Sequence, residues 1–404
     1  MTKGFDFLNF TIKLHSHPIL YEGLSMKPIE SEAQMFREAA VKTAQRIVQP
    51  KAAEIDASGD IPRALIDIFG KQGFLSIIIP EEYEGANGDP ATFCSVIEEI
   101  AKVCGSSALF ILAQGIGTLP ILTAGSPSQR ERYLIPISRR NHLTAFALTE
   151  SESIWTPTSI RTKAERQGAD YTLNGRKCFV TNGGIAQLYI VFASTGAERG
   201  EEGISAFVVE PETPGLRFGQ KEEKIGMRGL TTTDVIFENC RIPQGNRLGK
   251  EGEAWGVAMD ALHTSRVALG ALAVGIAKGA LDFTLRYATE RVQFGKTIAS
   301  FQAIQFMIAD MATQVEAARA LVYQVVEQIR PSSNEIGKLS SIAKSFATDA
   351  AMRVTTDAVQ ILGGYGYMKD YPIERMMRDA KVTQVYDGPN QIQRLMISRQ
   401  LIKG

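Results

Sequence analysis

One carboxylate stands at a position suited to proton transfer: Asp387, in the sequence Tyr386-Asp387-Gly388-Pro389 directly before the last helical pattern of the chain. A carboxylate in a glycine-containing turn beside a helix N-terminus suits proton abstraction better than burial in a core. The same residues also fit a structural role, because Asp is a common helix cap and Pro is favoured in the first helical turn. Two interpretations therefore stay open, a general base and a capping residue.

The segment around this turn, residues 360–394, resembles the C-terminal active-site region of the acyl-CoA dehydrogenases, a family of flavoproteins. In that family the turn usually reads Tyr-Glu-Gly-Thr, and its Glu is the catalytic base. The resemblance implies that Asp387 is the catalytic residue and that Gly388 contacts the substrate. Asp is one methylene shorter than Glu, and a misplacement of about 1 Å can lower a rate on the order of a hundredfold. Either the substrate or the turn must therefore move to meet Asp387.

Two strand ends are candidates for a flavin site, since the chain has neither the glycine pattern of a dinucleotide-binding fold nor a P-loop. Residues 146–150 read FALTE and residues 178–184 read CFVTNGG. Taken alone, each is an ordinary strand that ends in turn residues. Together they are similar to the family's FALTE and WITNGG segments, which implies that this chain binds FAD through Phe146, Leu148, Thr149, Phe179, Val180 and Thr181.

Two further segments resemble the parts of the family that reach the FAD of a neighbouring subunit. Residues 291–302 match the family pattern RxQFGKxIxxFQ, and residues 360–364 read QILGG. An arginine suits a pyrophosphate, and glycines let backbone N–H groups approach phosphate closely. The resemblance implies a homo-oligomer, a dimer of dimers (homotetramer), and adds the cofactor-binding residues Arg291, Phe294, Gln302, Gln360, Gly363, Gly364, Asn390 and Gln391.

The thioester site departs most from the family. After the FALTE segment the family has a Pro-Gly-Ala-Gly-Ser-Asp turn, whereas residues 151–156 read SESIWT and place Trp155 at the Ser position. Arg266 is kept at a position that contacts CoA, and His263 replaces the family's Asp, although a lone helical His is more often structural. Ser265 stands where some branches carry their base and cannot act as one. The predicted substrate-binding residues are Trp155, His263, Arg266 and Gly388.

Composition excludes several classes of partner. Forty-four basic side chains balance forty-four acidic ones, which argues against nucleic acid or an anionic membrane. The four cysteines and four histidines have no metal-binding spacing, so we expect no metal and a reduced, cytoplasmic protein. We expect no apolar run to reach the roughly 18 to 20 residues that span a bilayer. Residues 1–28 lack the pattern of a secretory signal and are expected to be an extension.

Hydrophobic periodicity predicts the elements that position these residues. Residues 29–142 read as an α-helical domain, residues 143–249 as a β domain of short strands, and residues 250–404 as an α-helical bundle of four long segments, 255–290, 301–330, 334–363 and 391–402. An Asn174-Gly175 hairpin is expected within an antiparallel barrel or sandwich. Helical, then small β, then helical is the α+β architecture of the acyl-CoA dehydrogenases.

The leading prediction is FAD-dependent α,β-dehydrogenation of an acyl thioester in fatty acid metabolism. Asp387 would remove the α-proton, and the β-hydride would pass to flavin N5. Electrons would leave to an electron-transfer flavoprotein or to oxygen. One alternative is a dehydrogenase or oxidase that acts on a carrier-protein-bound acyl or aminoacyl thioester, and the other is a flavin-binding relative that has lost the activity.

Overall fold

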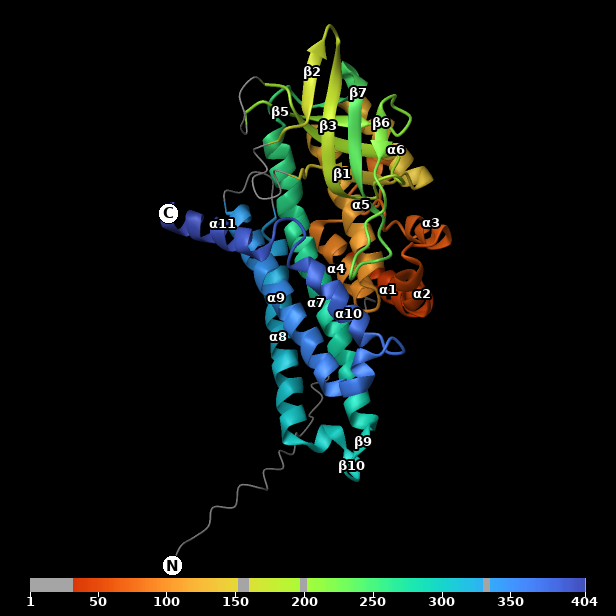
Figure 1. Cartoon of the computed structure of the whole chain (residues 1–404), viewed down its shortest axis with the longest axis vertical. Coiled ribbons are helices and arrows are strands. Elements are labelled where there is room, and N and C mark those ends of the chain that lie inside the picture. Colours follow the sequence, from red (N-terminus) through yellow and green to blue (C-terminus); the bar gives the residue numbers. More distant parts are fainter. Residues whose placement is uncertain (1–31, 152–159, 197–201, 330–334, 404) are drawn as a thin grey trace, which may run out of the picture. The chain divides into compact units, whose positions relative to one another are not determined.

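The computed structural model describes residues 32–151, 160–196, 202–329 and 335–403 (Figure 1). The predicted extension at residues 1–28 and the predicted substrate contact Trp155 lie outside these ranges.

The first third of the chain is helical, as predicted. Its first part is divided into separate helices, because Gly59 ends one helix in the left-handed conformation (φ 78°) and Pro62 precedes the next one. Side chains fix other starts: the Asp89 carboxylate accepts the Thr92 N–H at 2.7 Å. The helices are α1 (Glu32–Thr43), α2 (Ala52–Ser58), α3 (Arg63–Lys71), α4 (Pro90–Ala101), α5 (Gly105–Ala124) and α6 (Pro127–Arg140).

The middle of the chain forms one eight-stranded sheet in the order β6-β7-β3-β2-β4-β5-β8, with β1 paired to β4. Most neighbours are antiparallel, as expected, but β1 and β2 both run parallel to β4. Period-2 alternation reports which face a residue occupies and not the direction of its neighbour, so the sequence did not predict this mixture. The strands are β1 (Thr144–Ala147), β2 (Lys163–Gln167), β3 (Asp170–Thr181), β4 (Leu188–Ser194), β5 (Ile204–Val209), β6 (Leu216–Phe218), β7 (Thr232–Pro243) and β8 (Arg247–Leu248).

The predicted Asn174-Gly175 hairpin is wrong. Strand β3 runs straight through both residues, and the hairpin turn lies earlier, between β2 and β3 at residues 168–169. Gly175 instead serves a close approach, because a Cβ there would lie 2.6 Å from the Thr162 hydroxyl. The β3–β7 register shifts at the same place, which marks a bulge rather than a turn.

The last part of the chain is a helical bundle (Figure 1). Helices α7, α8 and α9 pack side by side, and α10 packs against both α7 and α9. The fourth helix of the bundle is therefore α10, whereas the segment predicted for this place, α11, packs mainly on α9. The helices are α7 (Ala254–Glu290), α8 (Gln302–Val326), α9 (Ile336–Leu362), α10 (Ile373–Thr383) and α11 (Asn390–Lys403).

Helix α7 also packs closely on α4, because a Cβ at Gly275 would lie 2.3 Å from the Glu98 carbonyl oxygen. Contrary to the sequence expectation, α5 and α7 are long and apolar enough to cross a membrane. In each of them 78% of the apolar window is buried inside the protein, which is typical of core helices.

Candidate active site

The turn that carries Asp387 joins α10 to α11 and has two successive left-handed residues, Asp387 (φ 53°) and Gly388 (φ 89°). A left-handed non-glycine residue is uncommon and needs support from its surroundings. Buried side chains supply that support at the two carbonyl oxygens. The Asp387 oxygen accepts bonds from Arg266 Nε (3.3 Å) and Gln393 Nε2 (3.1 Å), and the Gly388 oxygen accepts one from the same Gln393 atom (2.9 Å). These contacts fix the backbone of the turn from which the Asp387 side chain projects.

The Asp387 carboxylate is partly buried, and Ser265 Oγ on α7 donates a hydrogen bond to its Oδ2. Burial raises the pKa of Asp387 to about 6, while the Ser265 hydrogen bond and the nearby Arg266 and Lys344 cations act in the opposite direction. A pKa near neutrality means that the group is ionised at pH 7 and can still take up a proton. That is the property required of a general base.

Lys344 on α9 is fully buried next to this turn. Its Nζ donates to the Gly388 carbonyl oxygen (3.0 Å) and to Asn390 Oδ1 (2.7 Å), and burial lowers its pKa to about 7. Sequence reasoning missed Lys344, because a lysine in a helix is usually solvated. The available signal was the position of Lys344 along the helix. Ser341 and Thr348 lie three and four residues away from it and are buried on the same face of α9.

The amide of Asn390 is used inside the protein. Its Nδ2 donates to Thr348 Oγ1 (2.9 Å) and Asp349 Oδ1 (2.8 Å), so the side chain fastens the start of α11 to α9. Gln391, predicted beside it, is exposed, and the buried Gln393 holds the turn instead. The cofactor contacts of Asn390 and Gln391 stay predictions.

Arg266 reaches the turn, and its Nη1 is buried without a hydrogen-bond partner among the described residues. Burial lowers the pKa of Arg266 to about 10. A buried donor of this kind is costly unless a ligand or water satisfies it. His263, one turn earlier, faces the first turn of α9, where a Cβ at Gly337 would lie 3.3 Å from its Nε2. Burial lowers the pKa of His263 to about 4, so the imidazole is neutral at pH 7.

The two predicted flavin-binding strand ends lie side by side. The N–H of Cys178 in β3 donates to the carbonyl oxygen of Thr149, just beyond β1, at 2.8 Å. One residue earlier in β3, Lys177 Nζ contacts Glu150 Oε1 (2.6 Å) and the Leu148 carbonyl oxygen (3.0 Å). Both charged side chains are buried. Sequence reasoning missed this Glu150–Lys177 ion pair.

A bulge in β3 turns one aromatic ring outward. The β3–β7 register shifts between Lys177 and Val180, and Phe179 takes a left-handed conformation (φ 55°) with 57% of its surface exposed. Val180 points into the core, so only its backbone is available to a ligand. Phe146 packs on Phe192, with ring centroids 5.0 Å apart. The bulge therefore leaves Phe179 as a free aromatic surface at the strand end.

Burial raises the pKa of the Tyr386 phenol above its usual range and the Thr181 hydroxyl acts against this, so the strand end lies next to the turn. Because Tyr386 precedes Asp387, the two predicted motifs from the middle and the end of the sequence meet at one place. The structure therefore brings together Thr149, Phe179, Thr181, Arg266 and Asp387.

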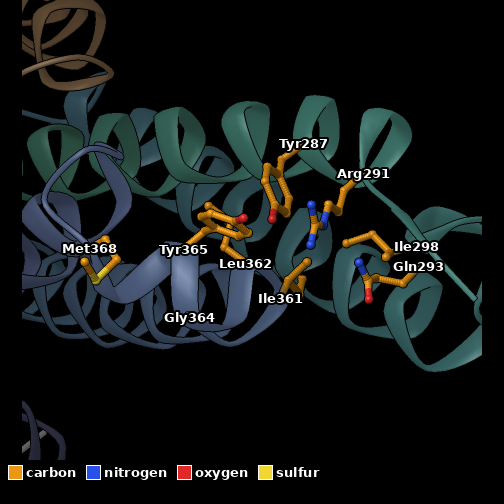
Figure 2. A pocket seen from close by; sticks show the side chains of 9 residues that line it. All are labelled: Tyr287, Arg291, Gln293, Ile298, Ile361, Leu362, Gly364, Tyr365 and Met368. Carbon is orange, nitrogen blue, oxygen red and sulfur yellow. The ribbon is translucent and has the colours of Figure 1, made fainter.

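The other predicted cofactor residues lie at the opposite end of α7, and Figure 2 shows Arg291 and Gly364 among them. A cavity of about 510 Å³ opens there between the ends of α7 and α9, lined by Arg291, Gly364 and Tyr365 among others. The Arg291 guanidinium carbon lies 5.1 Å from the centroid of the Tyr365 ring. A Cβ at Gly363 or Gly364 would meet no atom of the described residues within 4 Å, so their backbone is open to a ligand. Phe294, Gln302 and Gln360 are also exposed at this end.

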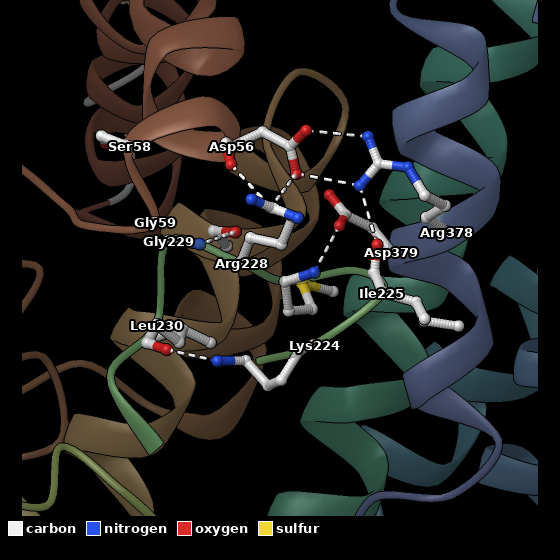
Figure 3. Close-up of polar contacts among 12 residues, drawn as sticks. Asp56, Ser58, Gly59, Lys224, Ile225, Arg228, Gly229, Leu230, Arg378 and Asp379 are labelled. Carbon is white, nitrogen blue, oxygen red and sulfur yellow. Dashed lines mark hydrogen bonds and ion pairs between the residues drawn. The ribbon is translucent and has the colours of Figure 1, made fainter. Parts of the chain in front are cut away.

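Helix α10, which leads into the turn, is anchored by a polar junction (Figure 3). Arg378 pairs with Asp56 of α2 (2.8 Å) and donates to the Ile225 carbonyl oxygen (2.8 Å). The neighbouring Asp379 is buried and accepts the Met227 N–H at 2.5 Å. Contacts from both preceding parts of the chain thus hold the helix that positions Asp387.

Comparison with known proteins identifies the class. Three family models match: the N-terminal domain of acyl-CoA dehydrogenase over residues 30–141, its middle domain over 145–240 and its C-terminal domain over 252–402. The chain therefore belongs to the acyl-CoA dehydrogenase family and is an oxidoreductase of that type, and the predicted α+β fold is confirmed.

Particular relatives refine this result. An acyl-CoA dehydrogenase of Bacillus subtilis is 45% identical over 93% of this chain and 99% of its own length. A cyclohex-1-ene-1-carbonyl-CoA dehydrogenase of Geobacter metallireducens is 45% identical over 93% of this chain and 100% of its own. The solved structure of butyryl-CoA dehydrogenase from Megasphaera elsdenii is 38% identical with a TM-score of 0.89, covering 92% of this chain and 98% of that one.

Proposed function

We propose that this protein catalyses FAD-dependent α,β-dehydrogenation of an acyl-CoA thioester and that Asp387 removes the α-proton. The observation that carries the proposal is the Asp387 carboxylate itself, which accepts a hydrogen bond from Ser265 and whose pKa is raised to about 6 by burial. The capping interpretation of Asp387 is less well supported, because its carboxylate bonds Ser265 on another helix.

The described residues fit an FAD molecule. Phe179 offers an exposed ring at a strained bulge, and Thr149 and Thr181 lie beside it. When bound there, the flavin would supply the acceptor for the β-hydride. The open backbone at Gly363 and Gly364 and the guanidinium of Arg291 suit a pyrophosphate.

The protein's own groups would act on the substrate around the turn. Asp387 would accept the α-proton on its carboxylate. The unpartnered Nη1 of Arg266 would donate to a polar group of the CoA thioester, which removes the cost of leaving this atom buried and unpaired. His263, neutral and turned toward α9, would line the site without a charge.

The proposal includes a homo-oligomer. Arg266 lies in α7 and Arg291 directly follows its last residue, and their separation in sequence corresponds to about 37 Å of helix. One FAD cannot bridge that length within one chain, so the two groups of predicted residues would serve cofactors bound at different subunits. A dimer of dimers, as in the resemblance noted above, accommodates this arrangement.

The substrate and the electron acceptor follow from the relatives. All three relatives described above are named for CoA thioesters, one with a cyclic and one with a straight acyl group, which favours CoA over a carrier protein. A similar solved structure is named for the electron transferring flavoprotein of Acidaminococcus fermentans, which supports such a flavoprotein as the electron acceptor. Four free, buried cysteines support a cytoplasmic location.

Anaerobic mixing of the purified, FAD-loaded protein with a panel of acyl-CoAs tests the proposal. We expect flavin absorbance to bleach with at least one straight-chain or cyclic acyl-CoA. Asp387→Asn should slow bleaching by about 1,000-fold, in the range of general-base catalysis, while FAD stays bound. Bleaching only with a loaded carrier protein would support the carrier alternative. Loss of bound FAD from the wild type, or equal bleaching by Asp387→Asn, would overturn the proposal.

A further inference from the structure

Ser265 makes an unusual contact for a serine inside a helix. Serine and threonine hydroxyls in helices commonly bond the carbonyl oxygen four residues earlier. The adjacent Thr264 does so, with Oγ1 3.2 Å from the Asp260 carbonyl oxygen. Ser265, only 2% exposed, instead donates to Asp387 Oδ2 across the space between α7 and the turn. In the described part of the chain, no other side chain donates to this carboxylate.

The backbone of the turn cannot adjust freely to bring Asp387 closer to a substrate. Arg266 and Gln393 hold the Asp387 carbonyl oxygen, and Lys344 and Gln393 hold the Gly388 oxygen. With the backbone fixed, the remaining freedom of the carboxylate is rotation about its two side-chain bonds. The bond from Ser265 restricts that rotation, so Oδ2 is occupied and Oδ1 is left to accept a proton.

We propose that Ser265 is a positioning residue for the base: it fixes the short Asp387 carboxylate and keeps it ionised. This inference rests on the proposed function for its catalytic consequence, while the contact itself can be tested without substrate. The proposal gives a role to position 265, where some branches of the family carry their base and this chain has a serine.

The charged groups around Asp387 determine the direction of the effect. Arg266 on α7 and Lys344 on α9 favour the carboxylate. Asp349 on α9 raises the pKa of Lys344, and Arg394 on α11 lowers it. The Ser265 hydroxyl also favours the carboxylate, since it donates to the charged form. Burial raises the pKa of Asp387 and the Ser265 hydrogen bond lowers it, so removing the hydroxyl should raise this pKa further.

The experiment compares Ser265→Ala with Thr264→Ala, which removes a hydroxyl one residue away that bonds only its own helix. We expect the acid limb of the rate of flavin bleaching to move up by about one pH unit in Ser265→Ala, as for a lost hydrogen bond to a charge. The rate at pH 6 should fall by about five- to tenfold with KM within about twofold. Ser265→Thr should restore most of the rate, and Thr264→Ala should match the wild type.

A second measurement keeps the inference testable if activity is absent. The infrared carboxyl band that disappears in Asp387→Asn can be titrated in wild type and in Ser265→Ala, with thermal unfolding as the control for folding. An upward shift of its midpoint in Ser265→Ala supports the inference even if no acyl-CoA bleaches the flavin. An unchanged midpoint, or an acid limb equal to that of Thr264→Ala, overturns it even if the enzyme is active.

Discussion

The β domain and the helical bundle each bury one lysine next to a carboxylate, and the two arrangements have opposite consequences. Lys177 contacts Glu150 directly at 2.6 Å. Burial raises the pKa of Glu150, but the Lys177 charge and hydrogen bonds from Lys177, Thr162 and Arg161 overcome this and hold it below its usual value. Lys344 instead bonds a carbonyl and an amide oxygen, and the pKa of nearby Asp387 stays raised to about 6.

The difference lies in where the ammonium points. A lysine that bonds the carboxylate makes a permanent anion that supports structure. A lysine directed to the backbone beside the carboxylate stabilises the turn and leaves the carboxyl group able to exchange a proton. Two buried lysine–carboxylate neighbours can therefore be told apart by their hydrogen bonds, one structural and the other suited to catalysis.

The largest expected effect comes from breaking the buried Glu150–Lys177 ion pair. Glu150→Gln leaves Lys177 buried without a counter-charge, which should destabilise the protein by about 3–5 kcal/mol. Thermal or urea unfolding measures this change.

Two controls accompany Glu150→Gln. The double variant Glu150→Gln/Lys177→Met should lose less stability than the single one, since no charge is then left unpaired. Glu210→Gln, which breaks an exposed pair with Arg132, should cost under about 1 kcal/mol. A loss in Glu150→Gln as small as in Glu210→Gln would contradict a structural role for the buried pair.

An intermediate effect is expected from Lys344→Met. Removing this cation raises the pKa of Asp387, and the Gly388 oxygen loses a donor, so the flavin-bleaching rate at pH 6 should fall by about tenfold and the acid limb should move to higher pH. Stopped-flow bleaching across pH 5–9 measures both changes. Lys338→Met, on the same helix but paired with the exposed Glu335, provides the control. An unchanged acid limb would show that Lys344 does not act on the base.

The smallest expected effect is that of Asp387→Asn on stability, and it is a gain where Glu150→Gln causes a loss. The folded pKa of Asp387 is about 6, above the value of about 3.9 in an unfolded chain, so the ionised carboxylate costs stability at high pH. Asp387→Asn should therefore raise the Tm slightly, fully above about pH 6, with the gain disappearing as the pH falls toward about 4. Calorimetry at pH 8 and pH 4 checks this, and a lower Tm at pH 8 would contradict it.

The sequence predicted the features that short motifs encode. It did not predict the features that depend on which elements pack together in three dimensions. The helical ends of the chain, the strand ends at Thr149 and Thr181, and the turn at Asp387 were all located from residue order. Lys177 and Lys344 were missed, because lysine is usually solvated and burial depends on the elements packed around it. The Asn174-Gly175 hairpin failed because the same dipeptide also suits a bulge pressed against Thr162.

The bulge at Phe179 has a consequence for attempts to make the protein more robust. A left-handed conformation at a non-glycine residue costs roughly 1–2 kcal/mol, and the exposed ring recovers little of this by packing. Glycine would relieve the cost, so a heat-selection screen of random variants would enrich it at this position. Such a screen would select thermostable variants that have lost the aromatic side chain proposed to hold the cofactor.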